Sequence, residues 1–452
     1  MSTEATPTAR TAPAGDQPVE DKYDDYSLRT VPESEIKSTW DIALVRMGFT
    51  VSASDLVFGY TLGLFFSFGN ALLIAIAYSA IISVVSILMG IIGVRERTSF
   101  ALTSRFAFGR EGSRLPSLVM AVIIAAFYGY ILGITVDVFP KAGSAGQIGY
   151  SIALGVLFLV ISGLGFERGL KWIGRFGVPV MILLVLVAVI GTVIHVGGFG
   201  AIIDAKPLQA GGMTVAGIIG LGVAKWLAGA TVTPDLLRFG RGTRTVVTTT
   251  VAEFLVGNLG FNLLGLILGL GLGKSDLGTA FGLLSLTWLA TVAFVLQSVT
   301  VEMNELYAAS LAASNGIGMR RTITNVIVGV VGIGIGYYGI SHGIIASFLT
   351  FIGYVGYALP AIPAIILADY FIVQRMRYPA GFAGLPAVNW RAIAAFVITV
   401  AINLYLGLYL GDVLWHSLPL IGGVVYIALS LPQLRAAWTT GSAARAVEPA
   451  AH

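Results

Sequence analysis

Four ionisable residues interrupt otherwise apolar stretches of the sequence, at positions Asp55, Lys225, Glu253 and Glu302. Lys225 stands beside Trp226 in VAKWLAGATVTPD, residues 223–235, where small residues and Pro234 follow the tryptophan. An unpaired charge is costly in an apolar medium, so such groups either pair with one another or handle a substrate or an ion. The pattern therefore indicates buried ion pairs that lock helices together, or a binding site.

The composition identifies the surroundings of these residues. Hydrophobic residues make up 56% of the 452 residues and charged residues only 11%, whereas soluble domains carry about 25% charged residues. The mean hydropathy is +0.87. Apolar runs of about 20 residues, each long enough for a helix to cross a bilayer, recur along the chain, and strand-like alternation is absent. The sequence predicts an all-α integral membrane protein.

We predict twelve transmembrane spans, at residues 40–64, 68–93, 115–138, 148–165, 176–197, 212–236, 246–272, 281–311, 321–340, 343–373, 390–410 and 414–432. Residues 1–38 and 436–452 are polar, and the first of these segments contains no apolar signal sequence, so we expect two disordered cytoplasmic tails. Spans 1–10 form a core within residues 39–373, and residues 374–435 hold the last two spans.

Basic residues are distributed unequally among the connections. The even-numbered connections hold 16 Lys and Arg residues and the odd-numbered ones hold 3. Cytoplasmic loops collect such residues, so both termini are expected on the cytoplasmic side of the plasma (inner) membrane. The net charge of +4 follows from the same asymmetry and does not indicate nucleic-acid binding.

Enzyme and channel signatures are missing from the sequence. The chain has no cysteine, and its four histidines lack the spacing of metal ligands. No nucleophile with an adjacent base and no repeated filter element is visible. We therefore expect a transporter rather than an enzyme or a channel.

Glycine, polar residues and proline mark two spans as irregular. Most of the 57 glycines are expected to serve close helix packing. However, SASDLVFGYTLG at 52–63 and the segment 223–235 are polar at mid-membrane depth, where non-helical backbone must line a cavity or be buried. We predict that spans 1 and 6 are broken helices, with VAKWLAG as the break in span 6. Breaks five spans apart indicate two inverted repeats around a central substrate site.

Five longer motifs can be read along the chain: VPESEIKSTWDIALVRMGF at 31–49, SRFAFGREGSRLPS at 104–117, TPDLLRFGR at 233–241, NELYAASLAASNGIGM at 304–319 and LPAIPAIILADYFIVQRMRY at 359–378. Together they resemble the nucleobase:cation symporter-1 family, most of all its bacterial cytosine permeases and purine–cytosine permeases. The resemblance covers residues 31–432 and implies the five-plus-five inverted-repeat fold of sodium-coupled amino-acid transporters, with two further C-terminal helices. It also implies import of a nucleobase or a related small nitrogen heterocycle by cation symport and alternating access, without another cofactor, by a monomer in the lipid bilayer.

The resemblance also assigns candidate substrate-binding residues. It implies that a planar base is held between Phe127 of the third span, with Tyr128 beside it, and Trp226 of the sixth. Aromatic faces on both sides of a flat heterocycle favour stacking, although the same side chains could simply pack. The resemblance places the amide that hydrogen-bonds the base at Gln297.

Three charged residues depart from the pattern of the family. Lys225, Asp55 and Glu302 stand where the cytosine permeases have small or uncharged residues, and we expect them to form one coupled cluster. The three charges could bind a charged or strongly hydrogen-bonding substrate, or they could neutralise one another beside a neutral substrate. The alternative substrate is therefore a charged amine, an amino acid or a vitamin-like solute. For Glu253 we expect structural packing.

The coupling ion depends on the same part of the sequence. Sodium-coupled relatives use two adjacent hydroxyls of span 8 and carbonyls of span 1, because sodium prefers oxygen ligands. Here the pair is Thr300 and Val301, so one hydroxyl is lost, and only Ser52 marks the carbonyls of span 1. Lys225 with Asp55 or Glu302 could instead carry a proton. We expect proton coupling rather than sodium coupling.

Overall fold

The computed structural model describes residues 30–140, 143–163, 166–379, 381–382, 384–411 and 414–446. Residues 1–29 and 447–452, most of the two predicted tails, lie outside these ranges. The part of the N-terminal tail that is described is folded: the Val31 amide donates to the Arg97 carbonyl at 3.0 Å, and the Lys37 amide donates to the Phe239 carbonyl at 2.9 Å. Residues 436–446 likewise continue a helix. The predicted tails are therefore too long at their inner ends.

Each predicted span coincides with one helix or with a run of consecutive helices. These are α1 (Thr39–Thr50) with α2 (Ala53–Phe65), α3 (Phe68–Glu96), α5 (Arg114–Asp137), α6 (Gly143–Gly163), α7 (Phe166–His195), α9 (Val215–Thr231) with α10 (Thr233–Leu237), α11 (Thr243–Ala252) with η2 (Glu253–Asn258) and α12 (Leu259–Leu272), α14 (Thr287–Ile317), α15 (Arg321–Ser341), α16 (Ile344–Ala358) with α17 (Ala361–Ala368) and η3 (Asp369–Val373), α18 (Trp390–Tyr409) and α20 (Ile421–Ala446). A short helix, η1 (Glu33–Glu35), precedes the first span, and others lie between the spans: α4 (Phe100–Phe108), α8 (Phe199–Ile203), α13 (Leu277–Leu283) and α19 (Leu414–Ser417).

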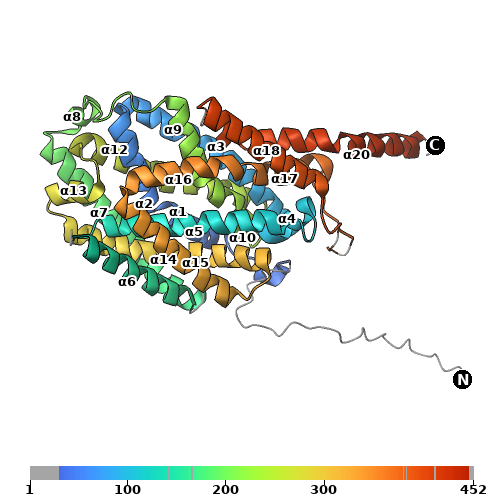
Figure 1. Cartoon of the computed structure of the whole chain (residues 1–452), viewed down its shortest axis with the longest axis horizontal. Helices are drawn as coiled ribbons and strands as arrows, with labels where there is room; N and C mark the ends of the chain where they lie inside the picture. Colours follow the sequence, from blue (N-terminus) through green and yellow to red (C-terminus); the bar gives the residue numbers. More distant parts are fainter. Residues whose placement is uncertain are drawn as a thin grey trace, which may run out of the picture.

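The lengths and apolar character of these helices fit a multi-pass membrane protein. Within the described ranges, 8 helices are long and apolar enough to cross a membrane, and the bent pair α1–α2 makes a ninth. The other predicted spans coincide with α14 and with the shorter apolar segments Pro179–His195 and Ile421–Leu434. Figure 1 shows α5, α14 and α15, which contact one another, lying side by side along the long axis.

The predicted break in span 1 is confirmed. Helix α1 ends at Thr50, α2 begins at Ala53, and the two are bent by 50°. Ser52 caps the second helix, because its hydroxyl accepts a hydrogen bond from the Asp55 amide at 3.3 Å. The polar residues that mark the break in the sequence thus start a new helix within span 1.

The predicted position of the break in span 6 is wrong. Helix α9 continues through Lys225 and Trp226 to Thr231, and the interruption falls at Val232. Small residues such as those of VAKWLAG remain compatible with a helix, whereas Pro234 lacks an amide hydrogen and suits the first turn of a new one. Lys225 and Trp226 therefore project from a regular helix one to two turns before the interruption.

Glycines allow α2 and α12 to approach closely, as expected for most glycines. A Cβ at Gly59 would lie 2.0 Å from the carbonyl oxygen of Asn262, and a Cβ at Gly265 would lie 2.1 Å from that of Leu56. Only glycine fits these two positions without moving backbone. The second half of span 1, α2, is thus held directly against α12 of span 7.

Candidate functional site

A buried ion pair joins the two irregular spans. The Lys225 ammonium donates to Oδ1 of Asp55, and the Trp226 indole N–H donates to the same oxygen at 2.9 Å. The Ser52 hydroxyl donates to Oδ2 at 3.1 Å. Asp55 is 0% exposed and Lys225 is 5% exposed. Both carboxylate oxygens therefore have donors, and the charge of Asp55 is compensated inside the protein.

The local structure explains why these charges are tolerated. Asp55 lies in the first turn of α2, where the free amides and the helix dipole stabilise a negative charge. The Lys225 ammonium lies 5.1 Å from the ring centroid of Phe58 and 5.5 Å from that of Trp226, so two aromatic faces also stabilise the cation. The pair is thus embedded in aromatic side chains rather than in water.

Trp226 is half-buried and offers a constrained aromatic surface. Its indole meets the ring of Phe254 edge-on, with centroids 5.6 Å apart and an interplanar angle of 79°. A Cβ at Gly229 would lie 3.1 Å from its Cε3 atom, so the indole lies over the glycine one turn further along α9. The hydrogen bond that the indole N–H donates to Asp55 constrains the ring from a third direction.

The two predicted aromatic residues of α5 differ in their surroundings. Phe127 contacts Phe351 of α16 edge-on at 5.0 Å and does not stack on Trp226 in the described part of the chain. Tyr128 is buried, and its hydroxyl donates to the Gly155 carbonyl of α6 at 3.0 Å. Its ring also packs on Gly332 of α15. Tyr128 therefore ties three helices of the scaffold together and is not brought to the ion pair.

Gln297 of α14 reaches the break in span 1. Its Oε1 accepts a hydrogen bond from the Ala53 amide at 3.3 Å. Its Nε2 is buried and finds no acceptor among the described residues. Gln297 therefore lies next to Ser52 and Asp55 and retains an unused donor. The side chain of Thr300, a predicted coupling-ion residue on this helix, lies outside the described residues.

The expected cluster of three charges is not formed. Glu302 is 0% exposed, and neither of its carboxylate oxygens has a hydrogen-bond partner in the described ranges. It interacts electrostatically with Glu305 on its own helix. Glu302 lies five positions after Gln297, which corresponds to a rotation of about 140° about the helix axis and a rise of about 7.5 Å. Gln297 faces the break, so Glu302 projects from another side of α14.

A second buried ion pair contains a residue that sequence reasoning missed. Arg46 of α1 donates to Glu253, to Ser86 at 3.1 Å and to Thr250 at 3.1 Å. The signal was present, since Arg46 is an arginine inside predicted span 1, and its side chain is 2% exposed. The structural interpretation of Glu253 fits this pairing. The seventh span is nevertheless irregular at Glu253, where the unpredicted π-turn η2 begins.

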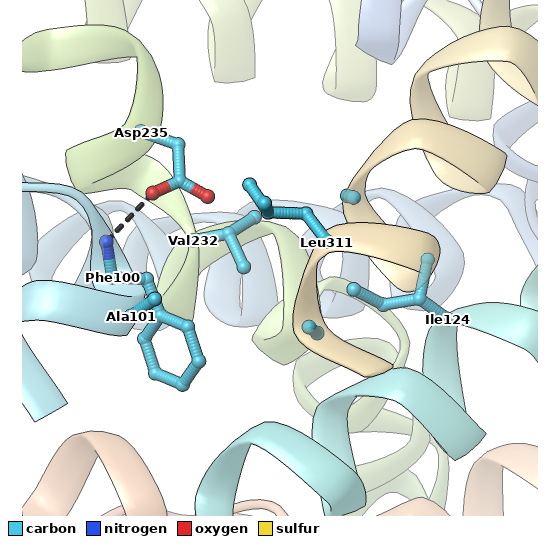
Figure 2. A pocket seen from close by; sticks show the side chains of 8 residues that line it. Phe100, Ala101, Ile124, Val232, Asp235 and Leu311 are labelled. Carbon is cyan, nitrogen blue, oxygen red and sulfur yellow. Dashed lines mark hydrogen bonds between the residues drawn. The ribbon is translucent and has the colours of Figure 1, made fainter. Parts of the chain in front are cut away.

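A cavity lies beside the interruption of span 6 (Figure 2). Asp235 of α10 accepts a hydrogen bond from the Phe100 amide of α4 at 2.6 Å, at one side of this cavity. None of the predicted binding residues lines it. Its lining residues are Phe100, Ala101, Ile124, Val232, Asp235, Ala308, Leu311 and Ala312.

Comparison with known proteins identifies the family. The family described as permeases for cytosine/purines, uracil, thiamine and allantoin matches residues 30–427. The chain belongs to this family. The permease is 26% identical over 406 residues to the cytosine permease of Escherichia coli strain K12, and the match covers 90% of this chain and 94% of the relative. The cytosine permease of Escherichia coli O157:H7 matches to the same extent.

Solved structures confirm the predicted fold of the permease. Mhp1, a nucleobase-cation-symport-1 family transporter in a closed conformation with bromovinylhydantoin bound, has a TM-score of 0.72 at 15% identity over 92% of this chain and 96% of that chain. Inward-facing Mhp1 gives 0.75 at 15% identity over 91% and 93%. A sodium-coupled sialic acid symporter gives 0.65 at 11% identity over 92% and 93%. The permease is a multi-pass membrane transporter of the nucleobase:cation symporter-1 family and not an enzyme.

Proposed function

We propose that this permease imports a nucleobase or a related small nitrogen heterocycle by cation symport and alternating access. The observation that carries the proposal is the group formed by Trp226, the Lys225–Asp55 pair and Gln297 at the break in span 1. It offers an aromatic face beside hydrogen-bonding groups, as recognition of a flat polar heterocycle requires. The cytosine permeases among the relatives support the same substrate class.

The charges of the site favour a neutral substrate over a charged one. Both oxygens of Asp55 are occupied, and the Lys225 ammonium is bonded to one of them. A charged amine would have to displace Lys225 and leave it unpaired in a buried position, which is costly. A neutral base needs only the free donor of Gln297 and the ring of Trp226, with Phe127 as the proposed second face. Glu302, whose carboxylate oxygens have no hydrogen-bond partner among the described residues, favours the alternative of a cationic amine.

The coupling cation is proposed to be a proton. Ser52 and Thr300 are the positions that a sodium site would use, whereas Asp55, Lys225 and Glu302 are ionisable. A sodium site would use main-chain carbonyls near Ser52 together with two hydroxyls of span 8, and Val301 stands in place of one of those hydroxyls. Uptake into vesicles with an imposed pH gradient, with and without sodium, separates the two ions. We propose that the transporting unit is a monomer.

Replacement of the stacking surface tests the proposed function. Trp226→Ala is expected to abolish uptake of whichever of radiolabelled cytosine, adenine, uracil or allantoin the wild-type permease transports. Trp226→Phe is expected to keep part of the uptake, because an aromatic face remains. Trp288→Ala serves as the control, because Trp288 of α14 is 72% exposed on the outer surface. Wild-type uptake in Trp226→Ala would remove this residue from the site.

The side on which loops are labelled tests the proposed orientation. The chain contains no cysteine, so single-cysteine variants need no background removed. Cysteine at the exposed positions Arg110 or Arg241 is expected to react with an impermeant maleimide only from the cytoplasmic side, and cysteine at Lys206 only from outside. Labelling from the opposite sides would reverse the topology.

A further inference from the structure

The seventh span contains a wide helical turn, η2, directly beside the candidate site. Residues Glu253–Asn258 form a π-turn between α11 and α12. Such turns insert one extra residue into an α-helix, are rare and often occur at functional sites. Leu255 and Val256 point outward, at 59% and 58% exposed, whereas the other four residues of η2 are buried.

Two buried residues of η2 hold the end of α1. Glu253 accepts the hydrogen bond of Arg46. Gly257 lies against the last residue of α1, since a Cβ on it would lie 1.7 Å from Oγ1 of Thr50. The π-turn therefore holds α1, the first half of span 1, up to its last residue, Thr50.

The other two buried residues of η2 support the aromatic side of the site. Phe254 meets Trp226 edge-on at 5.6 Å. Asn258 accepts a hydrogen bond from the Tyr78 hydroxyl at 2.7 Å. The Tyr78 ring in turn meets Phe58 edge-on at 5.4 Å, and Phe58 is the ring that lies next to the Lys225 ammonium. One turn of helix thus contacts the supports of both Trp226 and Lys225.

The location of η2 has a geometric reason. Helix α11 and η2 contact α1, whereas α12 contacts α2, and α1 and α2 are bent by 50° at the break. A regular α-helix keeps one register, and each residue added or removed rotates the following part by about 100°. One register cannot match two neighbouring helices that differ in direction. The extra residue of the π-turn, at the level of the break, lets Glu253 face Arg46 while Gly265 faces Leu56.

We propose that η2 is a positioning element of the substrate site, matched to the break in span 1, and that Phe254 is the positioning residue for Trp226. The proposal rests on the proposed function in one respect, the role of Trp226 as the stacking surface. Without the π-turn, span 7 can retain its contacts with α1 or those with α2, but not both. Without the Phe254 ring, the indole of Trp226 loses its contact on one side and its side chain can adopt other rotamers above Gly229.

Variants of η2 test this proposal through substrate affinity. Phe254→Ala is expected to raise the KM for uptake about 3- to 10-fold while Vmax changes less than about twofold, because the stacking surface is present but no longer held. Phe254→Tyr keeps the ring and is expected to restore the wild-type KM. Leu255→Ala, at the neighbouring outward-facing position, is the matched control and should have no effect. Removal of Val256, which makes the span a regular helix, should abolish uptake.

A second measurement does not depend on any substrate. The permease contains 7 tryptophans, so protein labelled with 5-fluorotryptophan gives a ¹⁹F resonance for Trp226 that is assigned by its loss in Trp226→Phe. This resonance should shift or broaden in Phe254→Ala and stay unchanged in Leu255→Ala. An unchanged resonance and an unchanged KM in Phe254→Ala would overturn the role of η2. If instead Trp226→Ala retains full uptake while the resonance responds as expected, Trp226 is not the stacking surface of the proposed function, whereas the positioning of Trp226 by Phe254 stands.

Discussion

Lys225→Met is expected to abolish uptake and to destabilise the permease by about 3–5 kcal/mol. Methionine keeps most of the apolar stem of lysine but removes the ammonium that bonds to Asp55. Asp55 is fully buried, so its carboxyl group would either stay charged, with only the Trp226 indole and the Ser52 hydroxyl as donors, or take up a proton, and both outcomes cost stability. The loss of stability is measured as a lower unfolding temperature of the purified protein in detergent.

The matching double variant distinguishes a pair from two independent residues. Lys225→Met combined with Asp55→Asn should recover much of the stability, because the uncharged amide can accept from Trp226 through its oxygen and donate to the Ser52 hydroxyl through its NH2 group. Lys225→Met combined with Glu302→Gln should recover none of it, since Glu302 has no bond to the pair in the described structure. Strictly additive effects of Lys225→Met and Asp55→Asn would show that the pair is not an energetic unit.

The same double variant tests proton coupling. If the Lys225–Asp55 pair carries the coupling proton, the recovered variant should exchange substrate across the membrane without concentrating it. Its uptake should also lose its dependence on external pH. Wild-type uptake that requires sodium and persists after the proton gradient is collapsed would contradict proton coupling while leaving the ion pair itself unaffected.

Arg46→Met is expected to have the second largest effect, again a loss of about 3–5 kcal/mol of stability. The substitution leaves Glu253 buried and removes the bonds to Ser86 and Thr250 that connect α1 to α3 and α11. The double variant Arg46→Met with Glu253→Gln should be more stable than Arg46→Met alone, because no buried charge remains. Thermal unfolding of the wild type, Arg46→Met, Glu253→Gln and the double variant gives the coupling energy.

A surface pair provides the control for this experiment. Arg114 and Glu111 form an ion pair at 2.6 Å, but both side chains are 56% exposed. Exposed pairs contribute about 0–1 kcal/mol, so Arg114→Met should change the unfolding temperature little. A comparable loss in Arg114→Met and Arg46→Met would mean that burial of the Arg46–Glu253 pair is not the cause.

The sequence alone determined the features that depend on local chemistry. Hydrophobicity over about 20 residues predicts helices that cross a membrane, whatever their neighbours are, and every predicted span coincides with helical segments. The break of span 1 was likewise predictable, because Ser52 caps α2 through a bond to the amide of Asp55, only three positions further along the chain. The family was recognisable from motifs that are continuous in the chain.

Which charged groups meet depends on how the helices pack against one another. Asp55 and Lys225 are 170 positions apart, and Arg46 and Glu253 are 207 apart, so no local pattern links them. Glu302 was expected beside Lys225, but a partner depends on how far each helix is rotated about its axis, and one residue changes that rotation by about 100°. The π-turn η2 has the same origin. It follows from the need of span 7 to match both halves of a bent neighbour, and that need exists only once the two spans are packed together.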